Sequence, residues 1–489
     1  MTLFKRKRDF YFNVLHYVGL VLMVCGFILL LPLLYLLFNS GEISNSFGFF
    51  LPAIAMMIIG LVIWLKIKPV VKSSFSITQS QFVVVISWII VCIFSTIPFI
   101  IIEKMSMLHA LFESVSGWTT TGLTLVDTSN CSTMILLWRS IMQFFGGAGL
   151  AIIMLATILG PQAPTLGVAE GRSTQLVPNV IHSSTIVLTL YLSYAIAGIV
   201  AYNLSGMGLF DSINHTLTAI STGGFSTKNA SIGYWNSLSI NIVTMILMIL
   251  GNLNFLTIYL LIHGKFKALF KNSEIKTLSL IVIVCVVLFY FFVGRSLYNG
   301  ISERIRISLF EVISAITTTG FTSTTYSGWT PFAFFMMITL MLIGGGTCST
   351  AGGIKQYRIF VLFKSTIWEL KKMLLPKKAV VENYIWQGEN KEYITSDQIR
   401  RISLFFFLYI STFIIGSGLI CLHGYSIQNS LFEFASALGT VGLSVGITST
   451  SAPIGVLWIE ILGMFLGRLE FIVILVTMIK FFRDLFGIN

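Results

Sequence analysis

Charged side chains are scarce in this sequence of 489 residues. Only 10% of the residues are Asp, Glu, Lys or Arg, whereas 55% are hydrophobic and the mean hydropathy is +0.89. Average soluble domains carry about 25% charged residues. The composition therefore excludes a water-soluble fold.

Cysteine and histidine are also rare, and so are the motifs of catalysis. The six cysteines are scattered, with only Cys131 expected outside the membrane, so neither a disulfide framework nor a metal-ligand spacing is present. His-Glu-x-x-His, a Gly-x-Ser-x-Gly elbow and clustered buried acids are missing, which predicts that the chain is not an enzyme. Without a P-loop or Gly-x-Gly-x-x-Gly, any regulatory nucleotide would bind a partner, and no organic cofactor is expected on this chain.

Long apolar runs dominate instead. A membrane-spanning helix needs about 20 apolar residues. Ten stretches qualify: Val14 to Phe38, Phe47 to Leu65, Phe82 to Ile102, Met134 to Leu159, Ile186 to Leu204, Ser239 to Ile262, Leu278 to Val293, Phe332 to Ile343 with a continuation from Ile354, Ile402 to Leu422, and Gly455 to Ile479. Ten crossings place both termini on the same side of the membrane.

The net charge of +12 reflects membrane topology. Most of the 31 Lys and Arg residues fall in segments on the side of the amino terminus, such as the runs 5–8, 66–72, 265–276 and 355–401. Cytoplasmic loops of membrane proteins carry such an excess of Lys and Arg. The positive charge is therefore explained by insertion in the lipid bilayer, and binding to nucleic acid is not expected. Both termini are therefore predicted to be cytoplasmic. The first apolar run is too long for the core of a signal peptide and is kept as a permanent span.

Four copies of one short motif are the strongest feature of the sequence. All share x-Thr-x-Gly followed by Leu or Phe, and each lies between two predicted spans. The copies are Phe112 to Leu123, Asn214 to Phe225, Phe310 to Phe321 and Phe432 to Leu443. Each is too short and too rich in Ser, Thr and Gly to cross the membrane, so it must enter and return. The predicted unit is a helix, a half-crossing pore helix, an extended loop and a second helix.

These units predict an all-α integral membrane protein with four repeats around one central pore, preceded by two extra transmembrane helices. The predicted boundaries are 1–72 for the two extra helices, 73–170, 171–272 and 273–370 for repeats one to three, 371–400 for a charged cytoplasmic connector, and 401–489 for repeat four.

The loops have the chemistry of a cation filter. Non-helical backbone at membrane depth must be buried in protein or line a water-filled cavity. Glycine lets extended segments aim carbonyl oxygens at one axis, and rings of carbonyls replace the hydration shell of a cation. The Thr of each copy can add a ring of hydroxyls at the inner end. The candidate filter residues are Thr120, Thr121, Gly122, Thr222, Gly223, Gly224, Thr318, Thr319, Gly320, Thr440, Val441 and Gly442.

Three acidic residues occupy one equivalent position in the pore helices, namely Glu113, Glu311 and Glu433. They could attract cations to the outer mouth, or they could only stabilise their helices. The pattern does not separate these alternatives.

The whole pattern resembles the superfamily of potassium transporters that includes the Trk, Ktr and plant high-affinity proteins. The resemblance covers nearly the whole chain, and the two preceding spans make it similar to the Trk membrane subunit. It implies potassium as the transported ion, because sodium-carrying plant members have Ser where this chain has Gly122. It also implies a homodimer in the bacterial inner membrane, regulated by a cytosolic nucleotide-binding, TrkA-like ring.

A second notable stretch interrupts the second helix of repeat three with ten small residues, from Gly344 through Gly345, Gly346 and Thr347 to Gly353. In the Trk family the similar stretch is an intramembrane loop that gates the pore. The alternative is a break that only lets helices pack closely. Arg468 lies inside the last span, where charge is costly. The resemblance implies that it faces the gating loop, and an internal pair with Glu470 or Glu460 is the alternative.

Three further features leave alternatives open. Arg139 is expected to extend to the membrane interface, without a role in function. Glycines at positions 147, 251, 344 and 467 could bend the second helices or only permit close packing. The stretch from Lys364 to Arg401 could dock a partner or form an interfacial helix with a loop.

A secondary transporter that couples potassium to protons or sodium is the competing function. Broken helices and repeats occur in that class too, but its repeats are commonly inverted, whereas four two-span units all keep one orientation.

Overall fold

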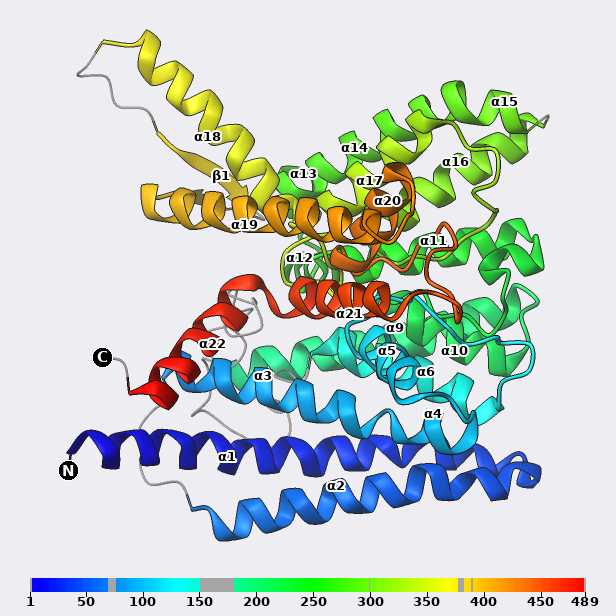
Figure 1. Cartoon of the computed structure of the whole chain (residues 1–489). Coiled ribbons are helices and arrows are strands. Elements are labelled where there is room, and N and C mark those ends of the chain that lie inside the picture. The colour runs from blue at the N-terminus through cyan, green and yellow to red at the C-terminus, as the bar shows by residue number, and fades with distance from the viewer. Residues whose placement is uncertain are drawn as a thin grey trace.

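The computed structural model describes residues 2–68, 76–149, 180–298, 300–376, 382–387 and 390–487. The predicted connector residues 377–381 and the region 150–179, which contains the end of the predicted span Met134 to Leu159 and the boundary between repeats one and two, lie outside it. Both chain ends lie on one side of the molecule, and the segment containing α18 and β1 extends to that side as well (Figure 1).

The chain begins with an antiparallel pair of helices. These are α1 (Thr2–Leu29) and α2 (Ser46–Lys66), joined by the short helices η1 (Leu31–Leu37) and η2 (Ser40–Asn45). A Cβ on Gly60 would lie 2.6 Å from the carbonyl oxygen of Gly19, and one on Gly26 would lie 2.9 Å from that of Ala53. Small residues therefore bring the two backbones together, as is common between membrane helices.

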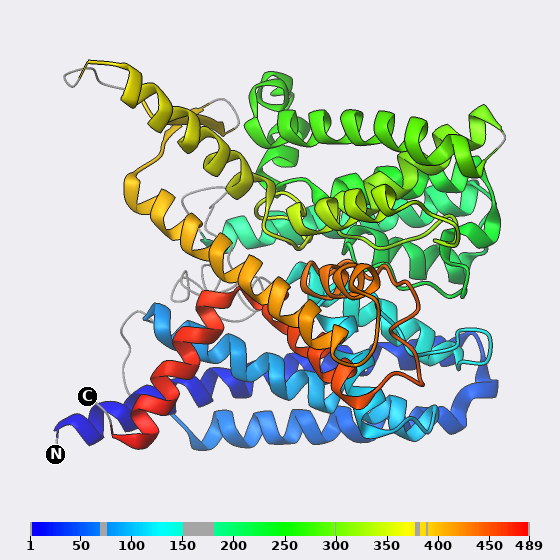
Figure 2. The same ribbon diagram turned by 45° about the horizontal axis from the view of Figure 1, so that its top comes forward.

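The rest of the chain runs four times through a long helix, a short helix and a further helix. The long helices are α3 (Ile77–Phe94) with α4 (Ile97–Ile102), α9 (Val180–Leu204), α14 (Ser273–Phe289) with η5 (Tyr290–Gly294) and α15 (Arg295–Leu297), and α19 (Ser396–Cys421). The short helices are α5 (Met107–Trp118), α10 (Leu209–Ile220), α16 (Ile301–Ile316) and α20 (Ile427–Leu438). The further helices are α6 (Thr133–Ala148), α11 (Leu238–Asn252) with α12 (Phe255–Ile262), α17 (Pro331–Ile343) with α18 (Gln356–Leu374), and α21 (Ile454–Leu469) with α22 (Phe471–Phe486). Figure 2 shows the same arrangement turned by 45°.

Local signals in the sequence place the helix starts. Ser76 and Thr395 form capping boxes with Gln79 and Gln398, and the Ser106 hydroxyl accepts a hydrogen bond from the backbone of α5. Such caps satisfy backbone N–H groups that the first turn of a helix leaves unpaired. The remaining elements are short: η4 (Ser231–Trp235), α13 (Phe266–Lys271), β1 (Tyr384–Gln387) and β2 (Asn390–Tyr393).

Six helices of the described residues are long and apolar enough to cross a membrane, and the number rises to eight if two bent pairs count as one span each. The chain is therefore a multi-pass membrane protein, and the number of ten crossings stays a prediction. The predicted spans Ser239 to Ile262 and Gly455 to Ile479 are each a bent pair of helices, as the possible bends at Gly251 and Gly467 allowed. The axes bend by 109° between α11 and α12 and by 103° between α21 and α22. The backbone leaves the helix at Leu253, which is extended, and at Glu470, which has a positive φ of 60°.

The glycines near these bends also serve close packing. A Cβ on Gly251 would lie 2.6 Å from the last carbonyl oxygen of α10, that of Ile220. Cβ atoms on Gly146 and Gly467 would meet the last carbonyls of α5 and α20 even more closely. In three of the four units, a glycine of the helix that follows the filter segment therefore packs against the last carbonyl of the short helix. In the first unit this glycine is Gly146, whereas Gly147 was the one expected.

The stretch from Lys364 to Arg401 combines the end of α18, an antiparallel hairpin of β1 and β2, and the start of α19. Val361, Trp368, Ile385, Ile394 and Ile402 form a small buried cluster that holds these parts together. The stretch from Lys364 to Arg401 therefore contains a β-hairpin packed against helices. The expected interfacial helix and loop had no such hairpin.

Candidate functional site

The four short helices are followed by backbone of one repeated conformation. The threonines Thr120, Thr222, Thr318 and Thr440 all have φ between 50° and 55°, and the glycines Gly122, Gly224, Gly320 and Gly442 have φ between 72° and 94°. A threonine in the left-handed region is rare and strained. That the same strain recurs at one place in four copies indicates a shared geometric requirement.

The glycines show what this requirement is. Each faces the carbonyl oxygen that precedes the glycine of the next unit, so that a Cβ would come well under 3.0 Å from that oxygen. The pairs are Gly122 with Gly223, Gly224 with Thr319, Gly320 with Val441, and Gly442 with Thr121. The order closes on itself after four steps. The four segments therefore surround one axis, and only glycine fits between neighbouring segments.

Hydroxyl groups inside three of the four short helices hold these segments. Ser116 accepts a hydrogen bond from the Gly122 backbone N–H at 3.1 Å and donates one to the Leu123 carbonyl at 2.6 Å. Ser314 and Ser436 make one bond of this kind each. These residues were not predicted from the sequence, although the common frame of the repeats contains the signal, since all four copies have Ser or Thr there.

Gln143 of α6 was also missed. Its side-chain amide donates to the Gly223 carbonyl at 2.6 Å and accepts from the Phe225 N–H at 3.0 Å. Gln143 is fully buried and so fixes the second segment from the first unit. A lone Gln in an apolar helix was the only available signal.

The acidic position of the short helices is fully buried in the three units that have it. Glu113, Glu311 and Glu433 are 0% exposed, and His215 occupies the same position in the second unit. Each of the four binds a hydroxyl of the segment that leaves its glycine: Thr124, Ser226, Ser323 and Ser444. These contacts favour the stabilising alternative, and the attraction of cations at the outer mouth stays a prediction. These side chains stabilise the outer end of the segments, which is more than support of their own helix.

Arg139 does not extend to the membrane interface, so that expectation was wrong. It is 1% exposed and lies 3.4 Å from the Glu113 carboxylate. Its guanidinium lies 4.0 Å from the centre of the Phe225 ring and donates to the Ser226 carbonyl. A buried charge needs such a partner, and Arg139 thereby joins the first and second units.

The glycine-rich break lies directly against the inner side of the four segments. The Gly352 N–H donates to the Thr318 hydroxyl at 2.7 Å, and the Thr350 hydroxyl lies 3.2 Å from that of Thr222. A Cβ on Gly352 would collide with the Thr440 hydroxyl. The loop 344–353 thus contacts three of the four threonines, and its small residues permit this approach.

Two buried side chains anchor the loop at its other end. Glu274, in the first turn of α14, accepts hydrogen bonds from the Thr347 N–H at 3.0 Å and the Thr347 hydroxyl at 2.6 Å. Asn252, at the end of α11, accepts from the Gly346 N–H at 3.2 Å. Neither residue was identified from the sequence, because each lies far along the chain from the loop.

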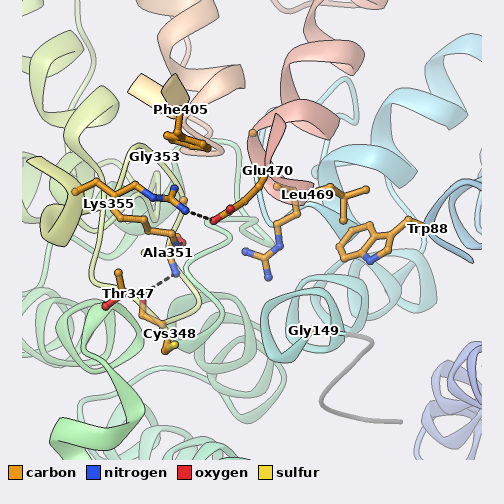
Figure 3. A pocket seen from close by; sticks show the side chains of 15 residues that line it. Trp88, Gly149, Thr347, Cys348, Ala351, Gly353, Lys355, Phe405, Leu469 and Glu470 are labelled. Carbon is orange, nitrogen blue, oxygen red and sulfur yellow. Dashed lines mark hydrogen bonds and ion pairs between the residues drawn. The ribbon is translucent and has the colours of Figure 1, made fainter. Parts of the chain in front are cut away.

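Arg468 connects the loop 344–353 to the first unit. It donates to the Thr350 carbonyl of the loop at 2.8 Å and to the Gly146 and Gly147 carbonyls at the end of α6. Neither internal pair that was considered for it forms. Glu470 binds Arg358 at 2.6 Å, and Glu460 lies beside Thr448. Figure 3 shows the cavity on the far side of the loop, where Thr347, Ala351 and Lys355 lie opposite Glu470 and Leu469.

The convergent segments bring backbone carbonyl oxygens and threonine hydroxyls together. Within the described residues, no cluster of three or more His, Cys, Asp or Glu could hold a resident metal ion. The donors are neutral carbonyl and hydroxyl oxygens, which suit a monovalent cation in transit.

Known proteins share this sequence and fold. A family model described as TrkH, cation transport protein, matches residues 45–484. An uncharacterized cation transporter of Methanocaldococcus jannaschii is 30% identical, over 95% of this chain and 94% of its own length. The Trk system potassium uptake protein TrkG of Escherichia coli is 29% identical, over 95% of this chain and 99% of its own. The crystal structure of the potassium transporter TrkH from Vibrio parahaemolyticus has a TM-score of 0.82 and 27% identity, covering 95% of this chain and 98% of that one. With four convergent segments and a matching model over most of its length, the chain belongs to the TrkH family of cation transport proteins.

Proposed function

We propose that the chain carries potassium through one filter made of the four convergent segments. The single observation that supports this most is the closed order in which each glycine meets the carbonyl of the next unit. Successive carbonyl rings replace the hydration shell of potassium, and the four threonine hydroxyls add a ring at the inner end. The filter then comprises Thr120, Thr121, Gly122, Thr222, Gly223, Gly224, Thr318, Thr319, Gly320, Thr440, Val441 and Gly442.

We further propose that the loop 344–353 is the gate and that Arg468 holds it closed. The contacts of Gly352 and Thr350 with the inner threonines leave the loop across the path of an ion. The charge of Arg468 opposes a cation there, and its donors hold the Thr350 carbonyl. The first part of the loop consists of the conformationally permissive glycines Gly344, Gly345 and Gly346, followed by Thr347, which Glu274 anchors.

Removing the Glu274 carboxylate should open this gate. Glu274→Ala deletes both bonds to Thr347, and hydrogen bonds to a charged group contribute about 1.5–3 kcal/mol each. Basal potassium flux into liposomes is expected to rise by about tenfold or more, because the loss of even one such bond, about 1.5 kcal/mol, corresponds to roughly a tenfold change. Glu303→Ala is the matched control, because Glu303 also lies in the first turn of a helix but has no contact with the loop. Equal flux in both variants would contradict the anchoring role.

Removing the Gln143 amide should weaken selection without opening the gate. Gln143→Leu leaves the Gly223 carbonyl and the Phe225 N–H without their side-chain partner. A net loss of about 0.5–1.5 kcal/mol per hydrogen bond predicts a fall of about three- to tenfold in the potassium to sodium permeability ratio. Reversal potentials under biionic conditions measure this ratio. In Gln79→Leu, which alters only a helix cap at the start of α3, the ratio should stay unchanged.

The orientation and partners follow the same proposal. Both termini and the hairpin of β1 and β2 lie on one side of the molecule, which we assign to the cytoplasm because the basic runs gather there (Figure 1). The chain would then lie in the bacterial inner membrane as a homodimer, with a TrkA-like nucleotide-binding ring on its cytoplasmic side. The packed hairpin is a suitable surface for that ring.

Passive conduction and coupled transport give different electrical results. The purified protein is reconstituted in liposomes, and the reversal potential is measured under opposed potassium and proton gradients. A potential that follows the potassium gradient alone supports a channel-like path. A potential displaced by the proton gradient supports the secondary transporter, and absence of potassium current or flux in the Arg468→Ala variant contradicts the proposed function itself.

A further inference from the structure

The fourth unit contains two buried carboxyl groups that share one hydroxyl. The Thr448 hydroxyl lies 2.5 Å from a Glu433 carboxyl oxygen of α20 and 3.1 and 3.2 Å from the two Glu460 oxygens of α21. Both acids are 0% exposed. Glu433 holds the fourth filter segment, as described above, whereas Glu460 has no role in the filter or gate described above.

Glu433 holds the segment that leaves the filter. It accepts hydrogen bonds from the Ser444 hydroxyl at 2.6 Å and from the backbone N–H groups of Val445 and Thr448, each at 2.9 Å. These residues follow Gly442 directly. The position of Glu433 therefore decides where the outer end of the fourth filter segment lies.

In the first unit, the buried carboxylate of the short helix lies beside a positively charged side chain, Arg139. Arg139 precedes Gly146 by seven residues, and Glu460 precedes Gly467 by seven residues. Both glycines meet the last carbonyl of their short helix, so Arg139 and Glu460 occupy equivalent places. Glu113 faces Arg139 there at 3.4 Å, whereas Glu433 faces a second acid.

Among the residues that the structure describes, no basic side chain compensates this pair. Within the described part of the chain, no Lys or Arg forms an ion pair with Glu433 or Glu460. The titratable groups of the neighbouring segments are the Tyr326 phenol, which interacts mainly with Glu311 and more weakly with Glu433, the His423 imidazole beside Gly455 just after α19, and His109 and Glu113 on α5, which packs against α21. Two unpaired carboxylates in a buried site cost several kcal/mol each, so one of the two must carry a proton.

We propose that Glu433 and Glu460 hold one proton between them and that this proton fixes the outer end of the filter in the fourth unit. Glu460 is a positioning residue for potassium selection, and the shared proton replaces Arg139 of the first unit. When the proton is lost, the two carboxylates repel each other, Glu433 moves, and the bonds to Ser444, Val445 and Thr448 weaken. Selection is therefore strongest at low pH and declines as the pH rises. This inference rests on the proposed filter.

The test measures selection against pH. The full-length protein is reconstituted in liposomes, and the potassium to sodium permeability ratio is measured with equal pH on both sides, from about pH 6 to about pH 9, where buried carboxyl groups titrate. The wild-type ratio should fall by a factor of about 3 to 10 over this range, as for the loss of one buried hydrogen bond. In Glu460→Gln the amide keeps a donor but cannot ionise, so the ratio should be high and constant.

Glu392→Gln is the matched control. Glu392 lies in β2, and burial raises the pKa of its carboxyl group, but it is remote in the fold from the filter. This variant should retain the wild-type dependence on pH. A wild-type ratio that is constant with pH, or a Glu460→Gln variant that keeps the wild-type decline, would overturn the shared proton. A wild-type protein without potassium preference at any pH would instead overturn the filter.

Infrared spectroscopy of the wild-type protein provides a second readout that needs no variant to fold. The difference spectrum between the two ends of the pH range should contain the carbonyl band of one protonated carboxyl group, lost at high pH. If the wild-type difference spectrum lacks this band, the proposal is contradicted. If the band is present in the wild type and missing in Glu460→Gln, it belongs to the pair of Glu433 and Glu460.

Discussion

Serine at position 122 is expected to destroy most of the preference for potassium over sodium. The Cβ of Gly122→Ser would collide with the Gly223 carbonyl, and the backbone φ of +94° is unfavourable for any residue with a Cβ. The Gly223 carbonyl has to rotate away from the serine side chain. The ring of carbonyl oxygens then accommodates sodium, which is smaller, as well as potassium. We expect the permeability ratio to fall by about tenfold or more, which corresponds to ~1.4 kcal/mol of lost discrimination.

The control for this variant separates backbone strain from filter geometry. Gly206 has nearly the same φ, +95°, but a Cβ there meets nothing within 4 Å. Gly206→Ser should therefore lower stability slightly and leave the reversal potential under biionic conditions unchanged. If both variants alter the ratio equally, or if Gly122→Ser leaves it unaltered, Gly122 is not part of the filter.

Alanine at position 468 is expected to raise the basal potassium flux by about tenfold to a hundredfold. The variant removes the bond to the Thr350 carbonyl and the charge below the filter at once. A hydrogen bond from a charged donor contributes about 1.5–3 kcal/mol, which sets this range. Flux of potassium into liposomes without any regulatory partner measures the effect.

Arg468→Lys distinguishes the two contributions. Lysine keeps the charge but lacks the planar fork with which Arg468 bonds Thr350, Gly146 and Gly147. If the bonds hold the gate closed, the lysine variant should leak nearly as much as the alanine variant. If the charge is the barrier, the lysine variant should stay nearly closed. Wild-type flux in Arg468→Ala removes the gate assignment.

Much of the architecture could be predicted from the sequence because it depends on local patterns. The apolar runs gave the membrane helices, and the common frame of Gly122, Gly224, Gly320 and Gly442 gave four equivalent segments before any contact was known. The bends within two of the spans were only one of two alternatives at Gly251 and Gly467. Hydropathy counts residues along the chain, whereas the bends at Leu253 and Glu470 depend on backbone geometry that hydropathy does not contain.

The charged residues were the least predictable. Arg139 near the end of an apolar run looked like a side chain that reaches the interface, yet Glu113 lies 3.4 Å from it in the core. The same limit applied to Glu274, whose partner Thr347 lies on another helix and far along the chain. The cost of burying a charge depends on its partners, and partners on other helices cannot be read from neighbouring residues.

The sequence by itself determined the membrane class, the four-fold repetition and the positions where a filter needs glycine, since hydropathy, period and the lack of a Cβ are properties of the residues. Only the tertiary structure decided how the copies differ. It placed the loop 344–353 against three of the four threonines, directed Arg468 to Thr350, and put an acid, Glu460, where the first unit has Arg139. Such differences arise from contacts between units, and burial leaves each ionisable group dependent on the partner that the fold brings to it.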